Sequence, residues 1–392
     1  MKKAFVIKTS SEISPLGRPV GDLILGQTRL SEYRASALRA AGFNGPQTAE
    51  INEEISGPAL VIADDTFASA RALKAFAQMI NAKKPQRPLA LVLPHSRQTE
   101  LFRPLQDVAE SSEGLEYAIR FIPEGHTGTA EALLTQTPCD TVTLPYREIL
   151  LAQKIPRFIL GTPSDEMEVP LTSTVVMRIR HWVHVLRLSH LWPQIQLIEQ
   201  SQRQWWKTLW NLIWGFSFSR HRRIANYYDR FCFIHASAHI HPTATVEASI
   251  IGKNVRIGAY ANVVGSVIAD DVTIEDRANI NHCVLGTKTF VSKNSTVVAS
   301  VAFGPTDVCV NGIQYALIDE GCALTSWARP LDALPNAPVR VKDGDDLREV
   351  GLLPCGVAFG KKCYVGANVM IAPGRVIAPE TTLLAEKDGI VT

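Results

Sequence analysis

A periodicity of 17 residues in the last third of the chain restricts its fold more than any other feature. Equivalent positions recur at Ser249, Ser266, Cys283 and Ser300, and the segment that starts at Leu317 continues the series one period later. A fixed short period means that each copy is one structural unit, which buries its apolar face only against its neighbours. Inside each period, aliphatic residues follow one another at steps of six, five and six, which fits neither a helix nor a flat strand.

A chain that makes three short strands per coil explains this spacing, because each strand points one aliphatic residue inward before the chain turns. The aliphatic series consists of Ile240, Val246, Ile251, Ile257, Val263, Ile268, Ile274, Ile280, Leu285, Val291 and Val297. The pattern resembles the left-handed β-helix of the hexapeptide transferase families, over residues 234 to 320 and 355 to 383. The resemblance implies a left-handed parallel β-helix of 17-residue coils in which Ile251, Ile268 and Leu285 lie one above another.

Length and composition narrow the class of protein. A chain of 392 residues exceeds one ordinary core, so we expect two domains. A formal net charge of +2 gives no global attraction for nucleic acid, and we predict no nucleic-acid partner. Seven cysteines without C-x-x-C spacing indicate a reducing compartment. The first residues form too short an apolar run for a signal peptide, so we expect a cytoplasmic location.

Residues 1–180 alternate strand-like and helix-like stretches. Strands are expected at 3–8, 58–65 and 87–94, and helices at 30–42 and 66–80. Ser31 is the predicted N-cap of the first helix and Gly42 its stop. This alternation predicts an α/β domain with a parallel sheet covered on both faces, whose ligands bind at the carboxyl ends of the strands.

Three segments resemble the sugar-1-phosphate nucleotidyltransferases. Leu30–Phe43 is similar to the helix after their nucleotide loop, Val61–Phe67 to the strand that ends in a metal-binding aspartate, and Trp182–Leu191 to the segment with the second acidic ligand. The resemblance implies a Rossmann-like, nucleotidyltransferase-type sheet that takes a sugar phosphate or a nucleotide. It also implies a role in envelope or glycoconjugate precursor metabolism.

Two departures from that family predict altered or lost metal chemistry. The stretch from Lys8 to Pro19 holds only Gly17, whereas a phosphate loop needs several glycines so that backbone N–H groups can approach the phosphates. His184 stands where the resemblance places a carboxylate, and a neutral imidazole is a poor Mg²⁺ ligand.

Asp64 and Asp65 are the candidate catalytic and metal-binding residues of the first domain. Two carboxylates at the end of a strand are able to hold Mg²⁺ against phosphates. The alternative is that Asp65 only caps the following helix. Lys8, Arg18 and Arg29 are candidate phosphate contacts at the same rim, or else ordinary solvated side chains.

Residues 181–230 form a connector rich in tryptophan. Trp206, Trp210 and Trp214 share one face of an expected helix, and a basic cluster follows at 219–223. Such a helix suits either packing between domains or oligomer subunits, or peripheral contact with the inner membrane. The apolar stretch is too short to span a bilayer.

The predicted β-helix, residues 231–392, carries one catalytic candidate. His282 is able to act as a general base toward acyl-CoA, or is an ordinary turn histidine. Residues 327–352 interrupt the period and read as a hairpin around Asp343 and Gly344.

Three functions follow from these features. The leading prediction is a sugar-phosphate nucleotidyltransferase-like protein, and the alternatives are an acyl-CoA-dependent acyltransferase and a non-catalytic binding or scaffold protein. The flat sides of a β-helix favour a homo-oligomer.

Overall fold

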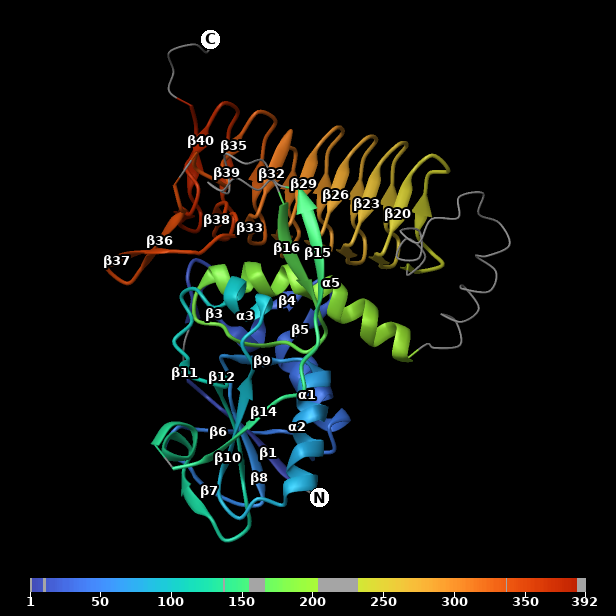
Figure 1. Ribbon diagram of the computed structural model, residues 1–392. Helices are drawn as coiled ribbons and strands as arrows, with labels where there is room; N and C mark the ends of the chain where they lie inside the picture. Colours follow the sequence, from blue (N-terminus) through green and yellow to red (C-terminus); the bar gives the residue numbers. More distant parts are fainter. Residues whose placement is uncertain are drawn as a thin grey trace. The chain divides into compact units, whose positions relative to one another are not determined.

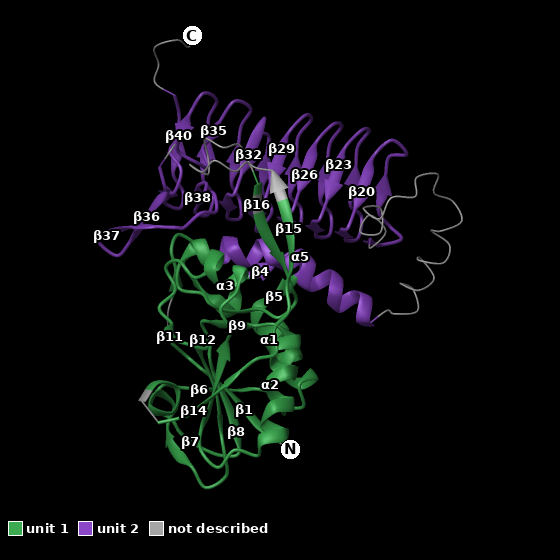
Figure 2. Cartoon of the chain, in the orientation of Figure 1, with its two compact units in different colours: residues 1–23, 28–155, 164–184 green, residues 24–27, 156–163, 185–392 purple. Residues whose placement is uncertain are grey.

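The computed structural model describes residues 2–9, 12–136, 138–154, 166–203, 232–335 and 337–385 (Figure 1). The chain divides into two compact units (Figure 2). The first comprises residues 1–23, 28–155 and 164–184, and the second comprises 24–27, 156–163 and 185–392. Each unit is described by itself below.

The first unit is built on a mixed sheet. Its strands are β1 (Lys3–Ile7), β6 (Gln47–Ala49), β8 (Ala59–Ala63), β10 (Leu89–Leu93), β11 (Ala109–Ser111), β12 (Gly114–Ile122) and β14 (Asp140–Thr143), and the order across the sheet is β14-β10-β12-β8-β1-β6. β1 runs parallel to β8 and β6, whereas β12 is antiparallel to both of its neighbours. The prediction of a wholly parallel sheet is therefore wrong. The reversal arises because β11 and β12 form a tight hairpin, with Ser111 opposite Gly114.

The described α-helices of this unit are α1 (Leu30–Ala40), α2 (Ala70–Lys83) and α3 (Arg97–Phe102), and it also contains the 3-10 helix η1 (Val20–Asp22) and the π-helix η2 (Ala132–Gln136). The N-cap of α1 is Arg29, so the predicted cap at Ser31 is wrong. Gly42 follows the last turn of α1 in the left-handed region, as expected for a stop signal.

The second predicted helix starts later than its sequence indicates. Thr66–Ala68 form a strand, β9, which pairs with β17 (Val176–Arg178). Ser69 then caps α2, since its hydroxyl oxygen accepts the backbone N–H of Ala72 at 3.3 Å. The alternative in which Asp65 caps this helix is therefore wrong.

The remaining strands of the first unit are short pairs. They are β2 (Glu12–Ile13) with β3 (Arg18–Pro19), β7 (Glu54–Ser56) with β13 (Thr127–Thr129), and β15 (Ile149–Lys154) with β16 (Glu166–Leu171). Strand β5 (Thr28–Arg29) also belongs to the first unit, whereas strand β4 (Ile24–Leu25) belongs to the second.

The second unit is a left-handed parallel β-helix, as the 17-residue period predicts, and Figure 1 shows its coils stacked in sequence order. One face contains β18 (Phe233–Ile234), β21 (Ile250–Ile251), β24 (Val267–Ile268), β27 (Val284–Leu285), β30 (Val301–Ala302), β33 (Leu317–Ile318), β38 (Ala358–Phe359) and β41 (Val376–Ile377). The second contains β19 (His239–Ile240), β22 (Arg256–Ile257), β25 (Thr273–Ile274), β28 (Phe290–Val291), β31 (Asp307–Val308), β34 (Ala323–Leu324), β39 (Tyr364–Val365) and β42 (Thr382–Leu383). The third contains β20 (Thr245–Glu247), β23 (Asn262–Val264), β26 (Asn279–Asn281), β29 (Thr296–Val298) and β32 (Gly312–Gln314), and a further pair joins β35 (Arg329–Pro330) to β40 (Met370–Ile371).

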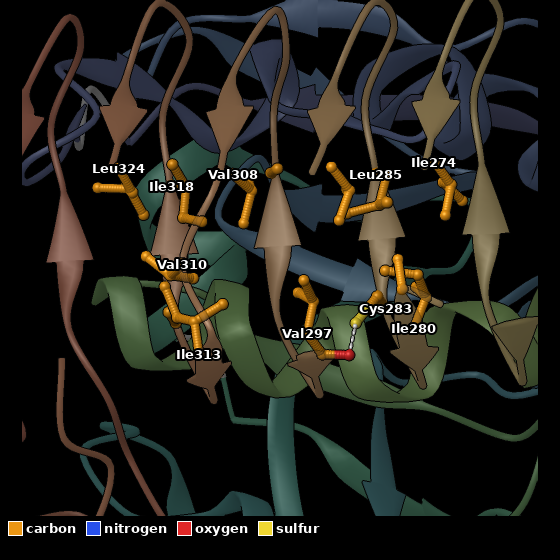
Figure 3. Close-up of a cluster of buried hydrophobic side chains, with 14 of the residues drawn as sticks. Ile274, Ile280, Cys283, Leu285, Val297, Val308, Val310, Ile313, Ile318 and Leu324 are labelled. Carbon is orange, nitrogen blue, oxygen red and sulfur yellow. Dashed lines mark hydrogen bonds between the residues drawn. The ribbon is translucent and has the colours of Figure 1, made fainter. Parts of the chain in front are cut away.

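Inward-facing aliphatic residues fill the interior of this unit (Figure 3). Ile251 pairs with Ile268 and Ile268 with Leu285, which confirms the predicted stack. One coil is one residue shorter than the period. The backbone N–H of Ala316 donates to the hydroxyl of Ser300 at a separation of 16 residues, whereas the equivalent bonds in earlier coils span 17. Leu317 consequently pairs with Val301, one residue earlier than the strict repeat places it.

The insertion contains the predicted hairpin. Strands β36 (Arg340–Asp343) and β37 (Asp346–Glu349) pair antiparallel, and Gly344 has the positive φ that their tight turn requires. Within residues 327–352, β35 (Arg329–Pro330) still belongs to a coil, because it pairs parallel with β40.

Helix α5 (Trp182–Arg203) forms the described part of the connector. Trp182 and Trp192 are fully buried side chains of this helix. Trp206, Trp210 and Trp214 lie outside the described residues, so the choice between internal packing and membrane contact stays a prediction. Among the helices that the structure describes, none has the length and apolarity needed to cross a membrane.

Candidate functional site

Asp64 follows β8 directly and forms hydrogen bonds to the end of the neighbouring strand β1 and to the residues after it. Its backbone N–H donates to the carbonyl of Ile7 in β1, which extends the parallel pairing by one residue. Its carboxylate Oδ1 accepts two hydrogen bonds from Thr9, one from the backbone N–H at 3.0 Å and one from the hydroxyl at 2.5 Å. The carboxylate thus closes the turn after β1, at the sheet edge where ligands of α/β folds bind.

Asp65 is entirely buried and serves as the counter-ion of two arginines. Its Oδ2 lies 3.0 Å from Nε of Arg178 and 3.7 Å from Nε of Arg180. The hydroxyl of Thr66 donates to Oδ1 at 3.2 Å. A buried carboxylate needs such partners, because an ionised group left unpaired away from water is very costly.

A third arginine, Arg34 of α1, contacts the segment that contains Asp64 and Asp65. The residue is 6% exposed, and its guanidinium donates to the backbone carbonyl of Asp64 at 2.5 Å. Burial lowers the pKa of Arg34, and the negative charges of Asp64 and Asp65 act in the opposite direction. A guanidinium keeps its proton even so, and the three arginines form a basic cluster around two aspartates.

Asp107 completes this cluster at its solvent side. Nη1 of Arg178 donates to the Asp107 carbonyl at 2.8 Å, and Nη1 of Arg180 lies 3.6 Å from the Asp107 carboxylate. The Asp107 side chain is 84% exposed, and that of Arg180 is 43% exposed. Arg180 is more exposed than Arg178 or Arg34, and both of its ion pairs are long, so it is the most accessible cation of the cluster.

The two candidate metal ligands do not fit a Mg²⁺ site as arranged. Mg²⁺ requires oxygen ligands with free lone pairs in octahedral geometry, whereas Asp65 faces guanidinium groups and Asp64 holds Thr9. Within the described residues, no group of three His, Cys, Asp or Glu side chains is arranged to hold a metal ion.

His184 has a structural role at the start of α5. Its Nδ1 accepts the backbone N–H groups of Arg180 at 3.1 Å and His181 at 3.2 Å, and its Nε2 lies 3.1 Å from the carbonyl of Pro104. These partners fix the tautomer with the proton on Nε2. The imidazole is fully buried, so the residue that replaces the family's carboxylate caps a helix here.

The three basic residues predicted to contact phosphate already have partners within the unit. Lys8 pairs with Glu50 at 2.5 Å, and this hydrogen bond and charge raise the pKa of Lys8. Arg29 pairs with Asp22 at 2.7 Å. Arg18 lies in β3, opposite Ile13 of β2. Lys8 is also close enough to Asp64 for the carboxylate to favour its charge.

Sequence reasoning missed the three arginines that surround Asp64 and Asp65. Arg178 and Arg180 alternate along the strand and loop before Trp182, a spacing that places both side chains on one side of an extended chain. That alternation was the sequence signal that could have identified Arg178 and Arg180 as site residues. Arg34 gave none, because a single arginine in an amphipathic helix is usually solvated.

The catalytic candidate of the β-helix, His282, occupies a corner between two faces. Its φ of 54° is the left-handed conformation of that corner, and its exposed imidazole lies against Gly265, where an added Cβ would be 3.0 Å from the ring. Although the residue is exposed overall, one side of the ring packs against Gly265, and the desolvation there lowers the pKa of His282, so the ring is neutral at neutral pH.

His190 of α5 lies beside this corner within the second unit. Its Nε2 donates to the carbonyl of Ala299 at 2.7 Å, and its ring meets that of Tyr315 edge-on with centroids 5.2 Å apart. Desolvation, reinforced by the charge of Arg187, lowers the pKa of His190 to about 3. The ring is therefore a neutral hydrogen-bond donor that joins the helix to the β-helix.

Comparison with protein families matches residues 229–326 to the GMPPB C-terminal domain. This match covers the repeat region up to residue 326 and supports the resemblance to nucleotidyltransferase-like proteins with a C-terminal hexapeptide-repeat domain. A comparison with curated proteins finds no significant match.

Solved structures of hexapeptide type match part of the chain. A candidate acetyltransferase of Bacillus cereus has 16% identity over 38% of this chain and 71% of its own, with a TM-score of 0.22. The UDP-N-acetylglucosamine acyltransferase of Francisella novicida has 12% identity over 39% and 60%, with a TM-score of 0.20. PerB of Caulobacter crescentus, solved with CoA and GDP-perosamine, has 13% identity over 39% and 51%, with a TM-score of 0.15. Scores this low do not bear on the reaction.

Proposed function

We propose that the first unit binds a sugar phosphate or a nucleotide sugar through arginine side chains, without a resident divalent cation. The chain would then be a nucleotidyltransferase-like binding protein whose metal chemistry has been lost. The observation that carries this proposal is the pairing of Asp65 with Arg178 and Arg180, because a carboxylate neutralised in this way is not available to Mg²⁺.

An arginine cluster is a suitable replacement for a metal in phosphate recognition. A guanidinium presents a planar fork of donors that matches two phosphate oxygens, and it needs no third ligand to hold its charge. Arg180 is the group best placed for this contact, since its side chain is 43% exposed and its carboxylate partners lie 3.6 and 3.7 Å away. A phosphate that approached Arg180 would displace weak ion pairs with exposed Asp107 rather than short buried ones.

The proposal assigns phosphate binding to this unit but not nucleotidyl transfer. Nucleotidyl transfer needs positive charge on the phosphates that come apart, which Mg²⁺ normally supplies. Arginines fixed to Asp65 are able to hold a phosphate but leave no site for the cation. We therefore assign to the chain a binding role in envelope or glycoconjugate precursor metabolism, and we propose that it acts as a homo-oligomer.

Isothermal titration with UDP-N-acetylglucosamine, GDP-mannose and mannose 1-phosphate tests the proposal. We expect one of these probes to bind equally well in Mg²⁺ and in EDTA. Arg180→Ala should weaken binding by roughly 10- to 100-fold, the loss typical of a charge-assisted hydrogen bond. The matched control is Arg39→Ala, which removes an equally charged but exposed side chain from the last turn of α1 and should leave binding unchanged.

An acyl-CoA-dependent transfer on the β-helix is the second candidate, favoured by one observation. His282 is exposed and neutral at neutral pH, as a general base must be. Release of free CoA from acetyl-CoA with an amino-sugar acceptor, abolished in His282→Gln with the melting temperature unchanged, would support it. If no CoA is released with any of the sugar acceptors tested, the acyltransferase function is contradicted and His282 has only a structural role at its corner.

A further inference from the structure

One interior position of the β-helix changes its chemistry along the stack of coils. The position is occupied in successive coils by Val255, Val272, Thr289, Thr306, Cys322 and Cys363. The backbone hydrogen bonds follow this order, since Phe290 donates to Thr306, Asp307 to Cys322 and Ala323 to Cys363. Cys322 and Cys363 are therefore consecutive members of one column, although 40 residues lie between them in sequence.

Side chains of neighbouring coils touch within this column. The hydroxyls of Thr289 and Thr306 lie 3.3 Å apart. One step further along, the Cys322 thiol donates to the carbonyl of Gly360 at 3.0 Å and the Cys363 thiol to the carbonyl of Ala378 at 3.1 Å, and the two thiols interact with each other. Adjacent strands of a sheet are about 4.8 Å apart, and a disulfide joins Cα atoms that are about 4.4–6.8 Å apart. The column therefore brings two thiols into the separation that a disulfide spans.

Two other cysteines of the β-helix, Cys283 and Cys355, have different neighbours. Ser266 precedes Cys283 in its column, and the hydroxyl of Ser266 accepts the Cys283 backbone N–H at 3.0 Å. Cys355 lies near Arg187 at the end of the insertion. Neither arrangement offers a second thiol, which makes these residues natural internal controls.

We propose that Cys322 and Cys363 form an oxidisable pair, a modification site at which a small disulfide such as oxidised glutathione converts two free thiols into a cross-link between consecutive coils. The cross-link joins the coil before the 327–352 insertion to the coil after it. Oxidation would therefore link covalently the two coils that flank the hairpin formed by β36 and β37.

The exchange balances in two steps. The thiolate of Cys363 attacks one sulfur of glutathione disulfide, which breaks that bond and releases one glutathione thiolate. The thiolate of Cys322 then attacks Cys363 Sγ in the mixed disulfide and releases the second glutathione. Two protein thiols are oxidised, one glutathione disulfide is reduced to two thiols, and the two protons lost by the protein pass to the departing thiolates or to solvent.

Burial makes this reaction slow in the closed protein. Desolvation raises the pKa of Cys322 to about 12 and raises the pKa of Cys363, so thiolate is scarce. Cys363 lies close to the end of the stack, where β41 and β42 are the last strands. Transient opening of these terminal coils would expose Cys363 first, which is why it is the attacking thiol.

Glutathione buffers of rising oxidised-to-reduced ratio test the pair on the intact protein. After an acid quench, free thiols are alkylated in denaturant, and tryptic peptides are identified by mass spectrometry. We expect the peptide that begins at Cys363 to be linked to the peptide containing Cys322, with a mass lower by two hydrogens than the sum of the two. The link should raise the melting temperature, because it closes a long loop in the unfolded chain, and dithiothreitol should reverse that rise.

Cys322→Thr is the matched variant, since threonine fills the same position one coil earlier at Thr306. It should abolish the cross-link and the rise in melting temperature, whereas Cys355→Ser should keep both. Cys309→Ser removes the other cysteine of the Cys322 peptide and should leave the linked mass detectable. Recovery of Cys322 and Cys363 as separate alkylated or glutathionylated residues, in protein whose circular dichroism is native, would overturn the proposal.

Discussion

Nε of Arg178 lies 3.0 Å from Oδ2 of Asp65, and the side chain of Asp65 is entirely shielded from solvent. The same carboxylate faces Arg180, and the carbonyl of the preceding Asp64 receives a hydrogen bond from Arg34. One of the two candidate metal ligands is thus the centre of an arginine cluster. This relationship is the basis of the metal-independent function proposed above.

Asp65→Asn should destabilise the protein by about 2–3 kcal/mol. Loss of a fully buried partner costs about 3–5 kcal/mol, and the value is lower here because Arg178 retains some contact with water. Asp107→Asn removes an exposed carboxylate from the same arginines and should change stability by less than about 1 kcal/mol. Urea denaturation of both variants measures the difference, and equal effects would contradict the burial argument.

His190 should make the protein sensitive to acid. Its folded pKa of about 3 lies below the usual value of 6.5, so the unfolded chain binds a proton that the folded chain refuses between these values. Stability from this group is complete above about pH 6.5 and falls as pH decreases toward 3, by about 1 kcal/mol per pH unit. His190→Gln should flatten that slope in denaturant melts between about pH 4 and pH 6.5. An unchanged slope would show that the imidazole does not titrate in this way.

Arg187→Leu should weaken the attachment of α5 to the C-terminal coils. The buried guanidinium donates to the carbonyls of Pro354 at 2.9 Å and Leu353 at 3.0 Å, and leucine would leave both acceptors unsatisfied. We expect a loss of about 2–4 kcal/mol, from about 1–3 kcal/mol for each buried acceptor less the gain from removing a buried charge. The exposed Arg203 in the last turn of the same helix is the control, and Arg203→Leu should be nearly neutral.

Ile257→Asp should prevent folding of the β-helix, whereas Arg256→Asp should be tolerated. The two residues are neighbours on β22, but Ile257 is 3% exposed in the interior and Arg256 points to solvent. A carboxylate in an aliphatic stack has no hydrogen-bonding or charged partner. The free-energy cost of burying it is comparable to the whole free energy of unfolding of a typical domain. Circular dichroism of both variants decides the matter, since native spectra for both would refute the inward orientation of Ile257.

The fold of the second unit followed from the sequence because its interactions are local and repeated. Each coil places the same residue types at the same positions, so the period alone fixes which residues stack. The one miss, the coil of 16 residues before Leu317, arises where a single deletion leaves the aliphatic pattern nearly intact.

The first unit was less predictable because its pairings are distant in sequence. The antiparallel β12 and the strand Thr66–Ala68 depend on partners far along the chain, and Thr66–Ala68 pairs with Val176–Arg178. The site shares this property. Asp64 and Asp65 were identified from a strand and its end, but the arginines that determine their role come from segments 30 and 113 residues away in the chain.

Titration of the tightest-binding nucleotide sugar, once in excess Mg²⁺ and once in excess EDTA, tests the central claim most directly. The arginine cluster predicts the same dissociation constant in both buffers and a large loss of affinity in Arg180→Ala. Binding that appears only with Mg²⁺ and disappears in Asp64→Ala would contradict it, because the carboxylates would then hold a metal.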